Sequence, residues 1–568
     1  MFKKVSYTFF LLLTSLSASA QQQADPDSVY DIQDSVLIKT RDGHRIASII
    51  VMKKGNKQRL PAILFFTPYD QGTSDSFFGK ISADHDYVGV VAYSRGIRTD
   101  LNEYVPYEHD GDDAYDVIDW ISKQSWCDGR VGMFGGSYVG FVQWSTIRKP
   151  HPALKTIVPQ VAVMPGFDAP MENNVPQGFA LSWPNSILNY KPLLRDLNQT
   201  WYDKGTSYRS LDSLAGQPNR IFQKWLQHPD YDTYWQSLVP SPDVYANLRI
   251  PILCTTGYFD GAQIGALEYA RQYYKNNPNP NLYFVIGPYD HWGGQRGSVA
   301  DTLMGYPIDS VAKISMRGLA FEWFDYVLKG KVKPDVLKDK FNYEVMDANE
   351  WRHASSLAAM SNDTLTLYLS DAKNGDRYSL TTLQPKKKGS LKQVVDFKDR
   401  TSQNNYYTPF IINDSLDASN GLVFATEPFT EPFALSGCFS GMVIASINKM
   451  DMDISMAFYE QKPNGQYFNL TRYLGRASYA KDNAKRNLLT PDRREEISLR
   501  DTRMICKEIS KGSRLVIVLN INKHPFEEIN YGTGKNVHDE TIADSGAPLQ
   551  IKWFTDSFVR VPVWKDHK

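Results

Sequence analysis

Compact apolar runs alternate with amphipathic segments over the first part of the chain. Three of these runs end in turn residues, as buried strands do, and they read AILFF at residues 62–66, YVGVVAY at 87–93 and RVGMF at 130–134. Between the last two, apolar residues spaced i, i+3, i+4 and i+7 mark one face of a helix: Ala114, Val117, Ile118 and Ile121. Strands that alternate with helices predict a mostly parallel sheet covered on both faces, an α/β fold.

The pattern changes twice farther along. From about residue 161 to 247, aromatic, Asn and Pro residues mix in short helix-like pieces, which predicts a helical insertion over the sheet. Strand-like runs resume at 250–257 and 282–287 and are followed by a helical pattern. After about residue 340 the runs are short or alternating and are broken by turn signals such as Asn464-Gly465, which predicts a β-sandwich.

These patterns divide the chain into parts. We expect an α/β domain in two pieces, residues 21–160 and 248–335, interrupted by a helical cap at 161–247 and followed by a β-sandwich at 336–568. A chain of 568 residues is longer than one hydrophobic core usually supports, in keeping with two or three domains.

The first twenty residues read as a secretory signal rather than as part of the fold. Lys3 and Lys4 precede an apolar run at 9–13, and the segment ends in Ala18-Ser19-Ala20, an A-x-A cleavage pattern. The apolar run is well short of the roughly 20 residues that a membrane span needs. We expect an exported chain, periplasmic or secreted, that begins at Gln21.

Charge and cysteine content exclude several classes of function. The 63 basic and 63 acidic residues balance, so neither nucleic acid nor an anionic membrane is indicated as a partner, and a homo-oligomer stays open. No two cysteines form a C-x-x-C pair, which disfavours zinc and redox chemistry, and we expect no metal and no cofactor. Two readings stay open for the thiols, a Cys438–Cys506 disulfide or buried free cysteines: Cys127, Cys254, Cys438 and Cys506.

Ser137 is the first candidate for chemistry. It stands in the stretch RVGMFGGSYVGFVQW, directly after a predicted buried strand and directly before a predicted helix. A serine at such a sharp turn projects from the sheet beside helix N-terminal N–H groups, and flanking glycines relieve the crowded backbone. The usual pattern is G-x-S-x-G, but here Val139 occupies the last position and the glycine comes one residue later. An ordinary strand-to-helix turn is therefore the alternative.

The partners of a nucleophilic serine can be sought by order along the chain. In one common arrangement the acid and then the histidine follow the serine, each at the end of a strand. Of the ten histidines, three precede Ser137, two come before the strands that would carry the acid, and four lie in or near the β-rich part. This leaves His291, just after a predicted strand in LYFVIGPYDHWGG. The preceding strand ends in PILCTTGYFDG, which offers Asp260. We expect Ser137 to attack a carbonyl, His291 to act as base and then acid, and Asp260 to orient His291.

The oxyanion formed in such a reaction needs hydrogen-bond donors. The backbone N–H of Tyr138, the residue after the nucleophile, is one candidate. The second should come from the loop after the AILFF strand, which reads TPYDQG and offers the hydroxyl of Tyr69.

Several motifs together carry a resemblance that covers nearly the whole chain after the signal. They are FFTPYDQ, YSRGIR, DWISKQSWCDGRVGMFGGSYVGF, GYFDG, GPYDHWGG, FEWFDYVLKG, HPDYDTYW and ATEPFTEPFALSG. The sequence resembles the cocaine-esterase group of serine hydrolases, which includes X-Pro dipeptidyl-peptidases, α-amino-acid ester hydrolases and glutaryl cephalosporin acylases. The resemblance implies an α/β-hydrolase fold with a cap and a C-terminal jelly-roll, the Ser137–Asp260–His291 triad, and an oxyanion-hole tyrosine at Tyr69. In this group the glycine that follows the serine also stands one position later than in G-x-S-x-G.

The sequence indicates the residues of the acyl pocket less clearly than it indicates the triad. In the related α-amino-acid ester hydrolases, acidic residues two and three places after the catalytic aspartate help to bind the substrate ammonium, and Ala262 and Gln263 stand there in this chain. That departure weakens an α-amino-ester or N-terminal dipeptide preference. Glu172 or Asp168 could supply part of such a cluster, although surface acids are the simpler interpretation.

Other side chains are open to two interpretations. Arg95 and Arg98 could pair with a substrate carboxylate or, for Arg95 especially, form a structural salt bridge. Three cap aromatics either line the acyl pocket or pack within the cap: Trp183, Tyr190 and Trp201.

The sequence thus predicts an exported serine hydrolase of acyl esters or amides, acting on a small molecule or short peptide. An enzyme that releases X-Pro dipeptides, or an α-amino-acid ester hydrolase or acyltransferase, is the alternative within the class. The alternative from another class is an inert binding protein whose β-sandwich holds a glycan.

Overall fold

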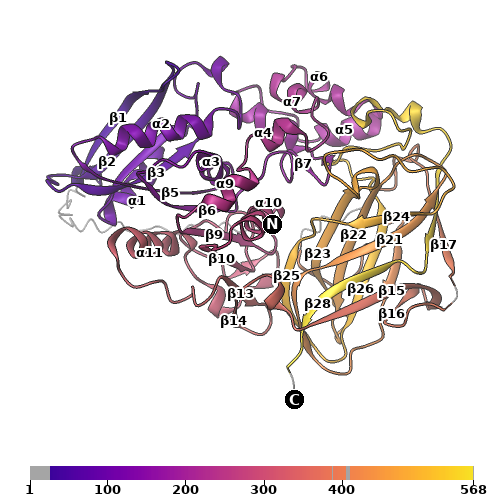
Figure 1. The fold of residues 1–568 in the computed structure, drawn as a ribbon. Coiled ribbons are helices and arrows are strands. Elements are labelled where there is room, and N and C mark those ends of the chain that lie inside the picture. The colour runs from indigo at the N-terminus through magenta and orange to yellow at the C-terminus, as the bar shows by residue number, and fades with distance from the viewer. Residues whose placement is uncertain (1–25, 387, 404–409, 567–568) are drawn as a thin grey trace, which may run out of the picture.

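The computed structural model describes residues 26–386, 388–403 and 410–566, and the predicted signal at 1–20 lies outside them. The chain forms two large lobes, an α/β lobe and an all-β lobe, which short helices of the intervening segment join along one side (Figure 1). No helix within these described ranges is long and apolar enough to cross a membrane.

A ten-stranded sheet forms the centre of the α/β lobe. Its strands from β4 to β13 run parallel, while β1 and β2 at one edge and β14 at the other are antiparallel to their neighbours. The spatial order is β1 (Tyr30–Lys39), β2 (Arg45–Lys53), β4 (Val88–Tyr93), β3 (Leu60–Thr67), β5 (Cys127–Gly136), β6 (Leu154–Gln160), β9 (Ile252–Gly257), β10 (Leu282–Gly287), β13 (Phe341–Val345) and β14 (Glu350–Ala354).

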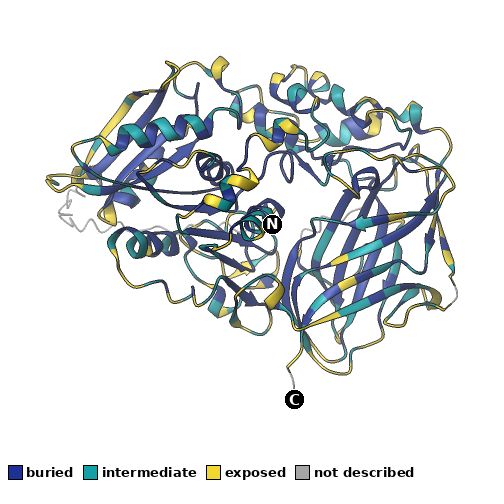
Figure 2. Cartoon of the chain, in the orientation of Figure 1, coloured by how far each residue is buried: buried dark blue, intermediate teal, exposed yellow. Residues whose placement is uncertain are grey.

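Helices cover both faces of this sheet, as the alternation of patterns predicts. Phe134 of β5 contacts Phe78 of α1 (Ser76–Asp84) and Phe321 of α11 (Met316–Lys329), so these two helices share one face. On the other face Trp144 of α3 stacks on Tyr269 of α10, with 4.6 Å between ring centroids. That layer consists of α2 (Asp110–Ser122), α3 (Tyr138–Thr146) and α10 (Gln263–Asn276). The strands between the two layers are largely buried (Figure 2).

The predicted amphipathic helix is α2. Its four apolar positions, Ala114, Val117, Ile118 and Ile121, have no exposed surface, which confirms the face read from the sequence. Acidic residues in its first turn complement the helix dipole.

The segment between β6 and β9 is mainly helical. A two-residue hairpin pair, β7 (Met171–Glu172) and β8 (Val175–Pro176), precedes its helices. These are short: α4 (Phe179–Ile187), α5 (Leu197–Lys204), α6 (Leu211–Leu214), α7 (Arg220–Trp225), α8 (Thr233–Gln236) and α9 (Pro242–Asn247).

The second lobe is a β-sandwich built from one continuous network of paired strands, and Asn464-Gly465 turns the chain between β22 and β23. Its strands are β15 (Asp363–Asn374), β16 (Arg377–Thr381), β17 (Ser390–Val395), β18 (Ile412–Asn413), β19 (Leu422–Ala425), β20 (Phe433–Cys438), β21 (Ser440–Ile447), β22 (Asp453–Gln461), β23 (Tyr467–Arg476), β24 (Glu495–Leu499), β25 (Met504–Ile509), β26 (Arg514–Ile521), β27 (Leu549–Phe554) and β28 (Phe558–Trp564). The predicted fold class, an α/β-hydrolase fold with a C-terminal β-sandwich, is confirmed.

The structure decides between a Cys438–Cys506 disulfide and free cysteines. Cys438 and Cys506 lie on paired strands but not opposite each other, because Cys438 faces Met504 and Cys506 faces Ser436. Both are free, as are Cys127 and Cys254, so of the two readings left open by the sequence the free cysteines are confirmed and the Cys438–Cys506 disulfide is wrong.

Candidate active site

Ser137 occupies a strained turn between β5 and α3. Its backbone has φ 63° and ψ −123°, a conformation that non-glycine residues rarely adopt and that costs of the order of 1–3 kcal/mol. This turn places the side chain at the carboxyl end of the parallel strands, directly before the first turn of the helix. The geometry is that of a nucleophile elbow.

Three glycines permit the close packing around this turn. A Cβ atom on Gly135 would lie 2.4 Å from Val139, and one on Gly136 would lie 2.2 Å from the side-chain oxygen of Gln295. A Cβ atom on Gly140 would lie 2.8 Å from the Cβ of Ala162. The late glycine therefore has a structural reason, because α3 packs against Ala162, after β6, at Gly140, while Val139 packs against Gly135.

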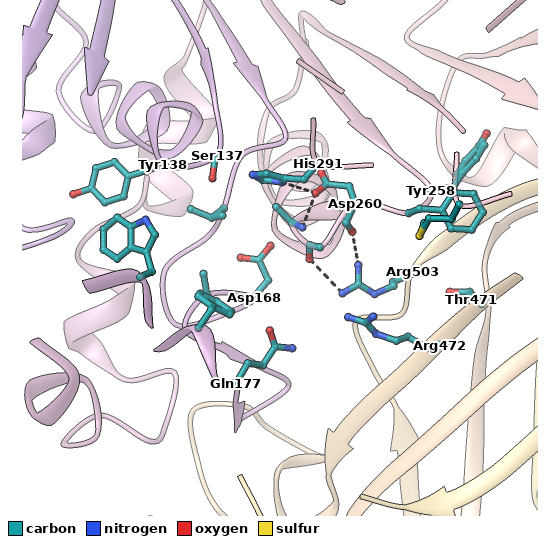
Figure 3. A pocket seen from close by; sticks show the side chains of 18 of the residues that line it. Ser137, Tyr138, Asp168, Gln177, Tyr258, Asp260, His291, Thr471, Arg472 and Arg503 are labelled. Carbon is teal, nitrogen blue, oxygen red and sulfur yellow. Dashed lines mark hydrogen bonds and ion pairs between the residues drawn. The ribbon is translucent and has the colours of Figure 1, made fainter. Parts of the chain in front are cut away.

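Asp260 and His291 follow the adjacent parallel strands β9 and β10. The Nδ1 atom of His291 lies 2.7 Å from Oδ1 of Asp260. Asp260 is buried and also accepts hydrogen bonds from the hydroxyl of Thr256 at 2.7 Å and the N–H of Ala262 at 2.9 Å. In Figure 3 the His291 ring lies between Ser137 and Asp260.

The two partners shift each other's proton affinity. Burial alone would raise the pKa of Asp260, but the charge of His291 and the hydrogen bonds to this carboxylate hold its pKa below the ordinary value. Burial alone would lower the pKa of His291, but Asp260 outweighs this effect and raises that pKa above 6.5. Asp260 thus stabilises the protonated imidazole.

Tyr69 and Tyr138 flank the serine from two sides. Tyr69 follows β3, and its hydroxyl accepts a 3.2 Å hydrogen bond from the indole of Trp183. Burial raises the pKa of Tyr69, so the phenol stays protonated. The side chain of Tyr138 is buried, and its hydroxyl donates a hydrogen bond to Asp110 at 2.7 Å. The backbone N–H of Tyr138 lies in the first turn of α3, and N–H groups in the first turn of a helix have no hydrogen-bond acceptor within that helix.

All five residues line one cavity of about 470 Å³. Most of its wall is apolar or aromatic, and three parts of the chain contribute: the α/β lobe, the helical segment and the β-sandwich. A concave, largely apolar site with a few convergent polar groups is typical of small-molecule binding. Besides the five, its wall includes Tyr107, Val163, Asp168, Gln177, Phe179, Trp183, Phe259, Met304, Phe410, Thr471, Arg472 and Arg503.

Two family models match the chain. The X-Pro dipeptidyl-peptidase (S15 family) model covers residues 42–293, and the X-Pro dipeptidyl-peptidase C-terminal non-catalytic domain covers residues 337–546. The chain belongs to the cocaine-esterase and X-Pro dipeptidyl-peptidase group of serine hydrolases. As a member of this group it is an enzyme.

Relatives of this serine hydrolase match it over nearly its whole length. The cocaine esterase of Rhodococcus sp. (strain MB1 Bresler) is 24% identical over 575 aligned positions, which cover 91% of this chain and 95% of the relative. An aminopeptidase from a marine sediment Thaumarchaeota archaeon superposes with a TM-score of 0.81 at 20% identity, covering 97% and 99% of the two chains. An α-amino acid ester hydrolase superposes with a TM-score of 0.75 at 20% identity, covering 97% and 100%. These structural matches show a shared fold.

Some of the predicted pocket residues of this hydrolase line the cavity and others do not. Trp183 and Asp168 line the cavity, whereas Trp201 does not, because it is buried within the helical segment, where its indole donates to the carbonyl of Ser207. The expectation of Trp201 as a pocket wall is not met. Glu172 is also absent from the lining residues, since it is buried against Arg503, with 2.7 Å between their charged atoms.

The arginines after β4 are structural. Arg95 pairs with Asp113 at 2.6 Å and with Asp42 at 2.8 Å, the salt bridge weighed from the sequence. Arg98 pairs with Asp70 at 2.8 Å. Neither lines the cavity, and Tyr190 does not line it either but packs against the core.

Sequence reasoning missed the contribution of the β-sandwich. Arg472 of β23 and Arg503, just before β25, both reach the cavity wall (Figure 3). Arg503 donates from Nη1 to the backbone carbonyl of Asp260 at 2.7 Å. Gln263 adds a second link, since its amide donates to the carbonyl of Met504 and accepts from the N–H of Met504. No local pattern marks these residues, because their role depends on how two domains dock.

Proposed function

We propose that this serine hydrolase cleaves acyl esters or amides through an acyl-enzyme on Ser137. The observation that carries the proposal is the 2.7 Å contact between Asp260 and His291 beside a serine held on a strained elbow in the same cavity. In this account His291 is the general base and acid, and Asp260 orients it.

In the first half-reaction the Ser137 oxygen attacks the substrate carbonyl while His291 takes the hydroxyl proton. The tetrahedral oxyanion collapses, the bond to the leaving group breaks, and His291 gives its proton to the departing alcohol or amine. In the second half-reaction His291 deprotonates a water molecule, which attacks the acyl-enzyme, and the Ser137 oxygen leaves with the proton. These steps need only protein groups and water.

The proposed oxyanion donors are the hydroxyl of Tyr69 and the N–H of Tyr138. The hydrogen bond from Trp183 holds the Tyr69 oxygen in place, and this leaves the phenolic proton to point elsewhere. Tyr69 and Ser137 line the same cavity, which supports a position of the hydroxyl next to the reacting carbonyl. Donors fixed before reaction stabilise the developing charge without reorganisation.

The aromatic part of the cavity wall favours an apolar acyl group. Tyr107, Phe179, Trp183 and Phe259 are among its aromatic residues. Among the described residues of the wall, Asp168 is the acid that takes no part in the proposed steps, and burial raises its pKa to about 8, so at neutral pH it is mainly uncharged. A site for a substrate ammonium would need a carboxylate there.

A panel of substrates tests this proposal. We expect p-nitrophenyl acyl esters to be turned over faster than Gly-Pro and Ala-Pro anilides, and Ser137→Ala to remove turnover of both. Faster release of the dipeptides would instead favour X-Pro dipeptidyl-peptidase activity, for which Asp168 would be the ammonium partner. Turnover unchanged in Ser137→Ala would refute the mechanism.

We also propose that the chain is exported. The proposal rests on the basic, apolar and small-residue pattern of residues 1–20. N-terminal sequencing of protein recovered from the periplasm or medium should begin at Gln21; an intact N-terminus on protein that stays in the cytoplasm would refute it.

A further inference from the structure

A second, smaller cavity borders the loop that carries Ser137. It has a volume of about 100 Å³, and within the described chain its lining shares no residue with that of the larger cavity. Gly135 and Gly136, the two residues before Ser137, form part of its wall. It lies on the face of the sheet that α1 and α11 cover, because Phe78 and Arg317 also line it.

The floor of this small cavity is aromatic. The rings of Phe65 and Phe78 are stacked with 3.9 Å between their centroids, and Phe134 lies 5.4 Å from Phe65. A flat apolar floor of this kind suits an aromatic ring or a short hydrocarbon chain. The cavity is smaller than an engineered apolar cavity of about 150 Å³ that binds benzene, so a ring would fill it and a carboxylate on that ring would lie at the rim.

The rim carries two neighbouring arginines. Arg296 lies over the ring of Trp292 at 4.8 Å, and Arg317 lies over the ring of Phe77 at 5.1 Å. Within the part of the chain that the structure describes, neither guanidinium pairs with a carboxylate, in contrast to Arg95. Burial and the charge of Arg296 lower the pKa of Arg317, so the two cations repel each other without a counter-charge.

We propose that this cavity binds a small monocarboxylate with an aromatic or short aliphatic body. The body would lie on the phenylalanine floor, and the carboxylate would pair with Arg296 and Arg317, since guanidinium groups bind carboxylates through two directed hydrogen bonds. The proposal does not depend on the reaction assigned to Ser137.

A bound carboxylate would contact Gln295, a side chain that supports the candidate active site. Gln295 lines the same cavity, its amide donates to the backbone carbonyl of His291 at 2.9 Å, and its oxygen packs on Gly136. An occupant would therefore contact a side chain that holds both the histidine loop and the serine loop.

Isothermal titration calorimetry with benzoate and its uncharged analogue benzamide tests the proposal. We expect saturable benzoate binding, benzamide affinity at least about tenfold weaker, and a similar loss of benzoate affinity in Arg317→Gln. Arg296→Gln, which replaces an exposed side chain, is a second variant expected to fold and to bind more weakly. The matched control is Arg560→Gln, because Arg560 also lies over a phenylalanine ring, at 4.7 Å from Phe558, but does not line this cavity.

A further variant locates the bound anion. Arg472→Gln removes a cation from the wall of the larger cavity, and we expect it to leave benzoate affinity unchanged. Loss of binding in Arg472→Gln with full binding in both rim variants would place the anion in the larger cavity and overturn the proposal. Absence of benzoate binding to the wild type, or equal affinity for benzamide, would also overturn it.

Discussion

The guanidinium of Arg503, in the β-sandwich, donates a 2.7 Å hydrogen bond to the backbone carbonyl of Asp260 in the α/β lobe. The same side chain donates to Glu172 at 2.7 Å, which fixes its orientation. Beside it, Gln263 exchanges hydrogen bonds with the backbone of Met504. The loop that carries the candidate acid is thus held by the second domain, and the β-sandwich positions Asp260 although it supplies no reacting group.

Arg503→Lys tests this positioning role. A lysine keeps the charge opposite the buried Glu172 but cannot hold that carboxylate and the Asp260 carbonyl in one planar fork. We expect kcat to fall about tenfold with little change in KM or Tm. Arg500→Lys is the control, since Arg500 donates to the carbonyl of Lys481 and does not contact the Asp260 loop. An unchanged kcat in Arg503→Lys would show that the clamp has no effect on the reaction.

Tyr69→Phe tests the proposed oxyanion donor. Loss of one such donor typically lowers kcat by about 10²–10³-fold, and we expect a loss in this range with little change in stability. Tyr190→Phe serves as control, because Tyr190 packs against the core and does not line the cavity. Steady-state kinetics on one ester would decide, and equal rates for the two variants would remove Tyr69 from the mechanism.

The raised pKa of His291 predicts a pH dependence. A base must be unprotonated, so kcat/KM should fall as pH decreases through a midpoint above 6.5. Asp260→Asn removes the carboxylate that raises this pKa, and the midpoint of the residual activity should move down. The measurement is the pH–rate profile of both enzymes between about pH 5 and pH 9. A profile flat through this range in the wild type contradicts the assignment of His291 as base.

Gly140→Ala tests the reason for the late glycine. The new methyl group would lie 2.8 Å from Cβ of Ala162, and such overpacking typically costs about 1–3 kcal/mol, against a gain in helix propensity of at most about 1 kcal/mol. We expect the free energy of unfolding to fall by about 1–2 kcal/mol in denaturant titrations. At Gly261, where a Cβ atom would meet nothing within 4 Å, the same substitution should change stability little. A stabilised Gly140→Ala would show that α3 does not pack tightly there.

The alternation of strands and helices in the α/β lobe was predictable, because each buried parallel strand appears in the sequence as a short continuous apolar run. Asp260 and His291 follow β9 and β10, which are adjacent and parallel with Gly257 opposite Gly287, so strand order alone brings their loops together. The face of α2 was likewise readable from its apolar spacing.

What could not be predicted depends on how separate parts of the chain dock. Trp183 and Trp201 both lie in the helical segment and look equivalent in sequence, yet one lines the cavity and the other is enclosed. Arg503 precedes a strand of the β-sandwich, and nothing near it in the sequence indicates that it contacts Glu172 and Asp260. Contacts between residues that lie far apart in the sequence leave no periodic pattern of apolar and polar positions from which they could be predicted.

The central claim is that Ser137 carries the acyl group during turnover. Acid quench of the enzyme during reaction with p-nitrophenyl acetate, followed by peptide mass spectrometry, tests it directly. We expect one added acetyl group, about 42 Da, on the peptide that contains Ser137, and none in Ser137→Ala. Turnover with no acyl group on that peptide, or an acyl group that persists on another residue in Ser137→Ala, would contradict it.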